Sequence, residues 1–238
     1  DRLTDLMADA PEVLRGWGRP LELAPNLGLV DGYLAGSDGQ RLAGMVEVLD
    51  RGATTLIAAR GGYGATRLLD RLPWRRLIED RVRLVGFSDL TALLDPLVAA
   101  GGATQVHGPM VAAGLEDLGN AERLRALLEG DLVGEALFSF GPDQVVRGGV
   151  VAGPARGGTL SLLASLAGTP WQPRLDGAVV FLEEVAEPPY RLDRMLTHLR
   201  CSGTFRGVKA LISVSLWDCD RFGPGPVAWP GLLAEAAP

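Results

Sequence analysis

Residues 82–98, VRLVGFSDLTALLDPLV, contain the transition that decides the fold. The first four residues are apolar apart from Arg83 and include two valines, which predicts a short buried β-strand. From Leu90 onward, apolar side chains recur at spacings of three and four residues, which predicts an amphipathic helix that the Gly101-Gly102 pair ends. A buried strand that leads directly into a helix is typical of an α/β protein with a parallel sheet.

The segment before this transition repeats the same pattern. Residues 54–59, TTLIAA, predict a buried strand, the glycine-rich turn RGGYG follows at 60–64, and a helical stretch occupies 65–71. Still earlier, Ser37 is placed to cap a helix that Gly52 ends. Alternating strands and helices predict an α/β fold, with a doubly wound, mostly parallel sheet in the N-terminal domain.

A change of pattern marks the domain boundary. A helix capped by Asn120 is expected first, and residues 131–153 then show short alternating runs with several glycines and no helical periodicity. We place the boundary there and divide the chain into domains 1–140 and 141–238. The first domain carries most of the alternating strands and helices described above.

The second domain is expected to be a smaller α/β unit. A glycine-rich turn is predicted at Gly157-Gly158, and the apolar run 179–182 predicts a buried strand. An amphipathic helix around 192–199 and a strand at 208–214 follow.

Composition and charge exclude several classes of function. The formal net charge is -6 and the charged residues are scattered, so we expect no nucleic-acid partner, because phosphate contacts need a basic face. No apolar stretch reaches the length that spans a bilayer, so no membrane partner is expected. The two cysteines, Cys201 and Cys219, form no disulfide framework and fit a reducing compartment. Histidine, cysteine and acidic residues do not cluster at ligand spacings, so we expect no metal and no cofactor.

Ser88 stands where the predicted strand stops and the helix starts. A serine there exposes its hydroxyl group at the carboxyl edge of the sheet, where helical N–H groups can stabilise an oxyanion. Leu90 replaces the second glycine of the G-x-S-x-G pattern. The alternative is that Ser88 simply caps the helix, and the tetrapeptide alone favours that alternative.

Two further segments could contribute chemistry. The backbone of residues 60–64 could donate N–H groups to an oxyanion or cradle a phosphate, or it could be only a tight turn. Glu183 and Glu184 end the strand at 179–182, and strand alternation sends their side chains to opposite faces. A solvated strand end is the alternative for this acidic pair. For the two histidines, His107 and His198, we expect structural or solvent-exposed roles.

Six stretches together carry a resemblance to a known family. They are GYLAGSD at 32–38, ARGGYGATRLL at 59–69, GFSDLTA at 86–92, HGPM at 107–110, LAGTPW at 166–171, and LEEV at 182–185 leading to PYRLDRML at 189–196. In order and spacing these resemble the LD-carboxypeptidase family of serine peptidases, which includes the microcin C immunity peptidases. The resemblance extends along nearly the whole chain.

The resemblance implies a Ser-His-Glu triad. It assigns the nucleophile to Ser88 and the acid that orients the histidine to Glu183. Backbone N–H groups of Asp89 and of Gly61 or Gly62 would form the oxyanion hole. The site is expected in a cleft between the two domains.

The chain departs from the family pattern in three places. The family's catalytic histidine lies near the C-terminus in a Gly-His context, and neither His107 nor His198 stands at a matching position. The family's first strand, with its Ala-Pro-Ser segment, also has no counterpart, so we expect a chain shortened at both ends. Thr159 stands where the family usually carries asparagine.

The resemblance implies an enzyme that releases the C-terminal D-alanine from murein tetrapeptide during peptidoglycan recycling. It further implies a cytoplasmic location and a homodimer. The alternatives are an immunity-type peptidase that cleaves a peptide-nucleotide of the microcin C kind, and a catalytically dead homologue or fragment that lacks the triad histidine.

Overall fold

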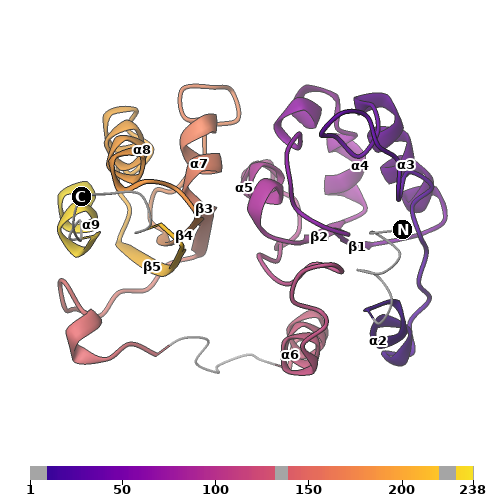
Figure 1. Cartoon of the computed structure of the whole chain (residues 1–238), viewed down its shortest axis with the longest axis horizontal. Coiled ribbons are helices and arrows are strands. Elements are labelled where there is room, and N and C mark those ends of the chain that lie inside the picture. Colours follow the sequence, from indigo (N-terminus) through magenta and orange to yellow (C-terminus); the bar gives the residue numbers. More distant parts are fainter. Residues whose placement is uncertain (1–9, 132–138, 220–228, 238) are drawn as a thin grey trace. The chain divides into compact units, whose positions relative to one another are not determined.

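The computed structural model describes residues 10–131, 139–219 and 229–237. The chain divides into two compact units, Asp1–Glu135 and Ala136–Pro238. Each unit has its own parallel sheet, and the fold is α/β as predicted (Figure 1).

The first unit is built around a short parallel sheet. Strand β1 (Thr55–Ile57) pairs with β2 (Arg83–Val85), in register from Thr55 opposite Arg83 to Ile57 opposite Val85. Val106 extends the sheet through a parallel bridge to Val85. The helical elements of this unit are α2 (Ala10–Gly16), α3 (Asp38–Asp50), η1 (Thr66–Arg71), α4 (Trp74–Glu79), η2 (Ser88–Leu90), α5 (Thr91–Ala99) and α6 (Leu118–Glu129).

Helices cover both faces of this sheet. Helices α3, α4 and α5 lie on one side, and α2 and α6 lie on the other (Figure 1). On the second side, Leu14 of α2 and Leu124 of α6 share a buried cluster with Val85 and Val106. The arrangement confirms the predicted doubly wound sheet, because both faces bury apolar side chains under helices.

Local signals in the sequence mark both ends of α3. Ser37 caps α3 as predicted, and the side chain of Gln40 completes a capping box. Gly52, just beyond α3, has a φ of 91°. The prediction that Asn120 caps α6 is wrong: the side chain of Asp117 accepts the N–H of Asn120 at 2.9 Å and is itself the cap. Aspartate and asparagine cap helices about equally well, so the sequence does not choose between them.

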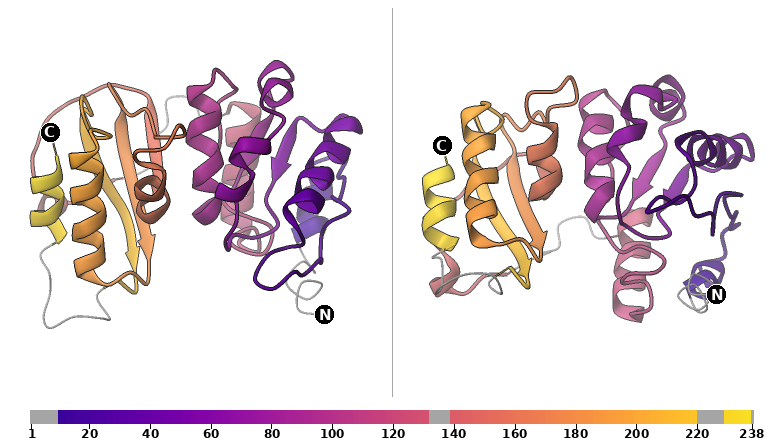
Figure 2. Two further views of the ribbon diagram at one scale, coloured as in Figure 1. Left: turned by 90° about the horizontal axis from the view of Figure 1, so that it is seen from above. Right: turned by 45° about the horizontal axis from the view of Figure 1, so that its top comes forward.

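The second unit contains a three-stranded parallel sheet in the order β3-β4-β5. Its elements are η3 (Pro142–Gln144), β3 (Ala155–Thr159), α7 (Leu160–Leu166), β4 (Val179–Val185), α8 (Pro189–Cys201), β5 (Ala210–Trp217) and α9 (Trp229–Ala236). Helices α7, α8 and α9 lie side by side against the sheet (Figure 2). Their buried residues include Leu160, Leu163, Leu192, Leu196 and Leu199, which pack with Val180 and Leu182 of β4.

The predicted glycine-rich turn at Gly157-Gly158 is wrong. Both glycines lie inside β3 and pair with Phe181 and Leu182 of β4. Gly157 has a φ of 124°, and a Cβ atom there would lie 1.9 Å from the carbonyl oxygen of Phe181. The glycine is therefore needed for close approach of two strands, which a sequence pattern cannot distinguish from a turn.

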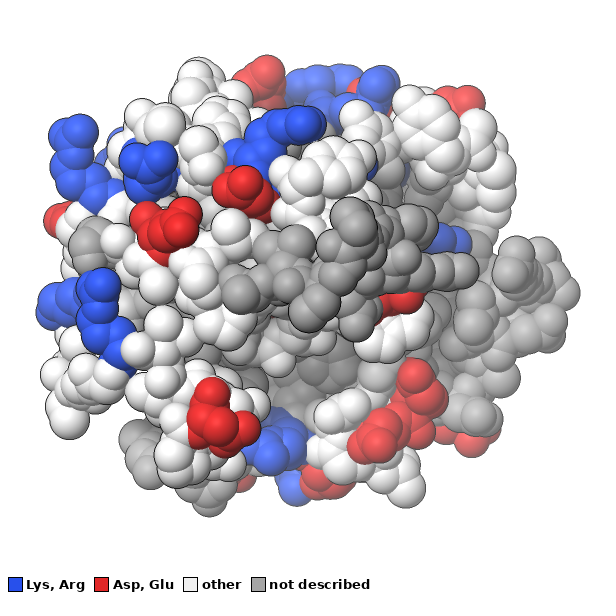
Figure 3. Space-filling model, turned by 60° about the vertical axis from the view of Figure 1, so that its left-hand side comes forward, with Lys and Arg blue, Asp and Glu red and all other residues white. Residues whose placement is uncertain are grey.

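The surface carries both signs of charge. On the face that Figure 3 shows, Lys and Arg side chains lie among Asp and Glu side chains. Within residues 10–131, 139–219 and 229–237, no helix combines the length and apolar character needed to cross a bilayer.

Candidate active site

Ser88 follows β2 closely and is the first residue of η2, which leads into α5. Its backbone has a φ of 59°, in the left-handed region that residues other than glycine seldom adopt. Phe87 and Leu90 occupy the N-cap positions of η2 and α5, so the alternative that Ser88 caps the helix is wrong. A strained serine at a strand-to-helix turn is typical of a nucleophile whose hydroxyl is presented at the edge of a sheet.

Gly61 lies against this serine. A Cβ atom on Gly61 would be 3.0 Å from Cβ and 3.1 Å from Oγ of Ser88. Gly62 has a φ of 138°, and no atom lies within 4 Å of the position that its Cβ would take. The structure thus brings the glycine-rich segment and Ser88 together, as an oxyanion hole built from both would require.

Asp89 links the nucleophile turn to the same segment. Its buried carboxylate accepts a hydrogen bond from the backbone N–H of Ala65 at 2.7 Å. Burial raises the pKa of Asp89, while the hydrogen bond from Ala65 and the positive charge of Arg41 act in the opposite direction.

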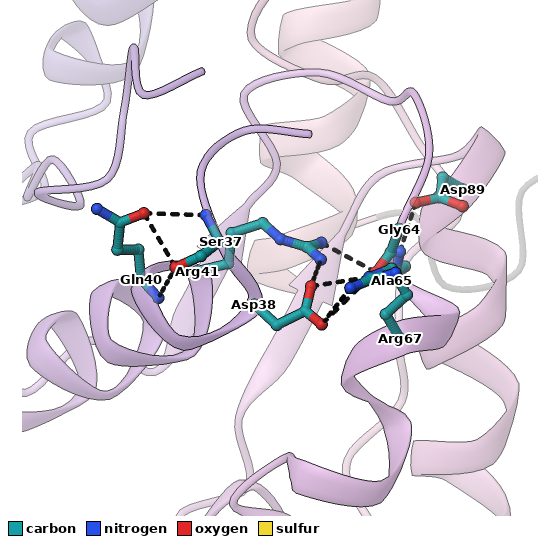
Figure 4. A network of polar contacts seen from close by, with 8 residues as sticks. All are labelled: Ser37, Asp38, Gln40, Arg41, Gly64, Ala65, Arg67 and Asp89. Carbon is teal, nitrogen blue, oxygen red and sulfur yellow. Dashed lines mark hydrogen bonds and ion pairs between the residues drawn. The ribbon is translucent and has the colours of Figure 1, made fainter. Parts of the chain in front are cut away.

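An ionic network adjoins this link (Figure 4). Arg41 of α3 donates from Nη1 to the carbonyl oxygen of Gly64 at 2.9 Å and from Nη2 to Oδ1 of Asp38 at 2.5 Å. Arg67 donates from Nε to the two carboxylate oxygens of Asp38 at 3.0 and 3.1 Å. Hydrogen bonds from Arg67 and Arg41 lower the pKa of Asp38 to about 2. Sequence reasoning missed Arg41, for which the only signal was its position three residues after Asp38.

Glu183 lies inside β4, in a buried position and not at a solvated strand end. The residue is 8% exposed, and its side chain accepts a hydrogen bond from the hydroxyl group of Thr159, its register partner on β3. Burial raises the pKa of Glu183, the Thr159 hydrogen bond lowers it, and the nearby charge of Glu184 raises it. The alternative of a solvated acidic pair is therefore wrong.

Glu184 has different partners. Its Oε2 accepts the N–H of Ser161 at the start of α7 at 2.7 Å, and its Oε1 accepts the N–H of Val185 at 3.0 Å. These bonds give Glu184 a structural role at the start of α7, as expected for neighbours whose side chains leave a strand on opposite faces.

The two histidines lie in contrasting surroundings. His107 is partly buried, with its ring centroid 6.2 Å from that of Phe87, and burial lowers its pKa to about 4. His198 is exposed on α8. In the part of the chain that the structure describes, no three His, Cys, Asp or Glu side chains come together as metal ligands would.

The candidate site residues divide between the two units. Ser88, Asp89, Gly61 and Gly62 lie together in the first unit, whereas Glu183 lies in the second. The convergence of Ser88 and Glu183 in a cleft between the domains stays a prediction.

Comparison with known proteins gives the family. The profile of the LD-carboxypeptidase N-terminal domain matches residues 2–108, and that of the LD-carboxypeptidase C-terminal domain matches residues 152–226. A carboxypeptidase homologue of Streptomyces coelicolor is 38% identical over 89% of this chain and 70% of its own length. The murein tetrapeptide carboxypeptidase of Pseudomonas aeruginosa is 35% identical over 79% of this chain and 64% of its own length.

Solved structures agree with this assignment. The muramoyltetrapeptide carboxypeptidase of Oxalobacter formigenes is 30% identical and superposes with a TM-score of 0.69 over 89% of this chain and 73% of its own. The microcin C7 self-immunity protein MccF superposes with a TM-score of 0.82 over 99% of this chain and 79% of its own, and at 22% identity it supports the fold alone. From its two domain matches and its relatives, the chain belongs to the LD-carboxypeptidase family.

Proposed function

We propose that the protein is a serine carboxypeptidase that releases the C-terminal D-alanine from murein tetrapeptide, with Ser88 as its nucleophile. The observation that carries the proposal is the left-handed backbone of Ser88, with a φ of 59°, directly against Gly61. An L-residue in this region costs about 1–2 kcal/mol, and such strain concentrates at functional sites.

The chemistry proposed for Ser88 has two stages. Its Oγ attacks the carbonyl carbon of the terminal peptide bond, and the backbone N–H groups of Asp89 and of Gly61 or Gly62 stabilise the negative charge that develops on the carbonyl oxygen. The D-alanine amine leaves with a proton, and the rest of the peptide stays on Ser88 as an ester. Water then hydrolyses this ester and restores the serine hydroxyl.

Glu183 is the proposed acid of the triad. It would orient a histidine and stabilise the imidazolium that forms when the histidine takes the proton of Ser88. The hydrogen bond from Thr159 supports this role, because it favours the ionised form of Glu183. The proposed histidine is the one that family members carry in a Gly-His context after a further strand. His107 does not suit the role, because burial lowers its pKa to about 4.

The substrate class rests on the relatives. The names of the Pseudomonas aeruginosa and Oxalobacter formigenes proteins specify murein tetrapeptide and muramoyltetrapeptide, and these proteins are 35% and 30% identical to this chain. MccF is 23% identical, which favours the murein substrate over a peptide-nucleotide. A cytoplasmic place in peptidoglycan recycling and a homodimer form part of the same proposal.

The test is an assay for D-alanine released from murein tetrapeptide by the full-length protein, paired with its intact mass. We expect release by the wild type and loss of at least about a thousandfold in kcat for Ser88→Ala. Equal release by Ser88→Ala would overturn the proposal. A protein whose mass equals that of residues 1–238 and which releases no D-alanine would identify the catalytically dead homologue instead.

A further inference from the structure

The peptide group that joins Gly64 to Ala65 is held at both of its polar atoms. Arg41 donates to the carbonyl oxygen of Gly64 at 2.9 Å, and the N–H of Ala65 donates to the carboxylate of Asp89 at 2.7 Å (Figure 4). Both residues of this peptide are buried. Because buried backbone groups need partners, a rotation of the peptide would break two hydrogen bonds together.

Two properties of Gly64 matter for these hydrogen bonds: the freedom of its backbone to rotate and the absence of a side chain. It has a φ of 111°, which a glycine adopts without steric cost, so its backbone has wide freedom to rotate. A Cβ atom at Gly64 would lie 3.0 and 3.1 Å from the two terminal nitrogens of Arg41 and 2.6 Å from Cδ2 of Leu34. The guanidinium group therefore packs directly against the Cα atom and reaches the carbonyl oxygen only because residue 64 has no side chain.

Arg41 is itself fixed. Its side chain is 11% exposed and forms an ion pair with Asp38, one turn earlier on α3. The start of α3 is in turn fixed by the capping box of Ser37 and Gln40. A planar guanidinium that bonds two partners at once holds its geometry better than a lysine would.

The held peptide connects the two proposed halves of the oxyanion hole, because its N–H group is bonded to the side chain of Asp89. Gly61, which faces Ser88, precedes it by three residues, and Asp89 follows Ser88 directly in the chain. We propose that the side chains of Arg41 and Asp89 are positioning groups that hold the glycine-rich segment at its working distance from the nucleophile. This inference rests on the proposed function of Ser88.

If Arg41 and Asp89 act as positioning groups, removing them should weaken stabilisation of the transition state and leave substrate binding unchanged. Oxyanion donors act on charge that develops only during the reaction, so a displaced donor lowers kcat and leaves KM nearly unchanged. We expect Asp89→Ala and Arg41→Met each to lower kcat about tenfold to a hundredfold. Asp89→Asn keeps an oxygen that can accept the Ala65 N–H, so its kcat is expected to fall less than that of Asp89→Ala.

The experiment measures kcat and KM for D-alanine release together with amide hydrogen exchange of the full-length protein. In Asp89→Ala and Arg41→Met, exchange is expected to rise in residues 61–65 and stay unchanged elsewhere, which also verifies that the variants fold. Arg125→Met is the matched control, because the ion pairs that Arg125 forms with described residues, Glu122 and Glu129, lie on the surface of α6. Its kcat and its exchange in residues 61–65 are expected to match the wild type.

Three other outcomes would contradict the positioning role or the proposed function. Faster exchange in residues 61–65 with an unchanged kcat would overturn the positioning role and leave a purely structural one. A raised KM with an unchanged kcat would also overturn it. If the wild type shows no Ser88-dependent release, the proposed function fails, and the inference fails with it.

Discussion

Gly61 faces Ser88 so closely that a single methyl group on Gly61 would reach both side-chain atoms of the serine. The Cβ atom of an alanine there would lie 3.0 Å from Cβ and 3.1 Å from Oγ of Ser88. Carbon atoms without a bond between them prefer separations of about 3.5–4.0 Å, so Ser88 would have to move by a few tenths of an ångström. The serine and the glycine-rich segment therefore form one unit, in which a change at either residue displaces the other.

The first prediction concerns Gly61→Ala. We expect kcat for D-alanine release to fall about tenfold to a hundredfold, because small displacements of reacting groups have large effects on rate. Gly149→Ala is the control, since a Cβ atom at Gly149 meets no atom within 4 Å. Steady-state kinetics of both variants provide the test, and a Gly61→Ala enzyme with the wild-type kcat would contradict the proposed contact.

The strained backbone of Ser88 gives a prediction about stability. Both Ser88→Gly and Ser88→Ala remove the hydroxyl group, but only glycine adopts a φ of 59° without steric cost. The free energy of unfolding of Ser88→Gly should exceed that of Ser88→Ala by about 1 kcal/mol. Urea unfolding measures this difference. Equal or lower stability of the glycine variant would show that the serine backbone is not strained.

Thr159→Val should shift the dependence of activity on pH. Burial raises the pKa of Glu183, and the hydrogen bond from Thr159 opposes that increase. Without the hydroxyl group the pKa of Glu183 rises further, so the ionised form that orients the histidine is lost at a higher pH as the solution is acidified. The acidic limb of the kcat/KM profile should therefore move to higher pH in Thr159→Val and stay near that of the wild type in Thr159→Ser.

The neighbouring acids Glu183 and Glu184 should respond differently to substitution. Glu183→Gln is expected to lower kcat at least about a hundredfold, because the triad acid must be charged. Glu184→Ala leaves the N–H of Ser161 without its acceptor and should lower the free energy of unfolding by about 1–3 kcal/mol. Kinetics and urea unfolding of both variants separate the catalytic role of Glu183 from the structural role of Glu184. A Glu184→Ala protein of wild-type stability with a hundredfold lower kcat would contradict this division.

The lowered pKa of His107 leads to a prediction of how the free energy of unfolding depends on pH. Its pKa is about 4 in the folded protein against a usual 6.5, so its contribution to stability is present above pH 6.5 and is lost as the pH falls toward 4. The loss amounts to about 2–3 kcal/mol. In His107→Gln, the free energy of unfolding should decline less between pH 7 and pH 4.5. His198→Gln is the control, because His198 is an exposed histidine on α8. If the wild type, His107→Gln and His198→Gln showed the same pH dependence of the free energy of unfolding, the prediction would be contradicted.

The fold was predictable wherever the signal is local. The buried run at 82–85, followed by the apolar spacing from Leu90, predicts β2 and α5, because each pattern lies within one element. The same locality placed Ser88 at the junction between strand and helix.

Features that depend on contacts distant in sequence could not be predicted in this way. Arg41 and Gly64 are 23 residues apart, and no periodic pattern joins them. The positive φ of Ser88 also leaves no mark in composition, since serine is common in ordinary turns and caps. A pair of glycines such as Gly157-Gly158 is compatible with a turn and with a close approach of two strands. In the structure the pair lies in β3, where it allows β4 to approach closely.

Gly157 has a consequence for anyone who sets out to engineer this protein. The position lies inside a buried strand, where a stabilising design guided by β-propensity would introduce valine or isoleucine. Such a side chain would begin 1.9 Å from the carbonyl oxygen of Phe181 and force the two strands apart. The register between β3 and β4 also pairs Thr159 with Glu183, two residues further along. In a library of single variants, substitutions at residue 157 should therefore be depleted by selection for folding and also by selection for activity.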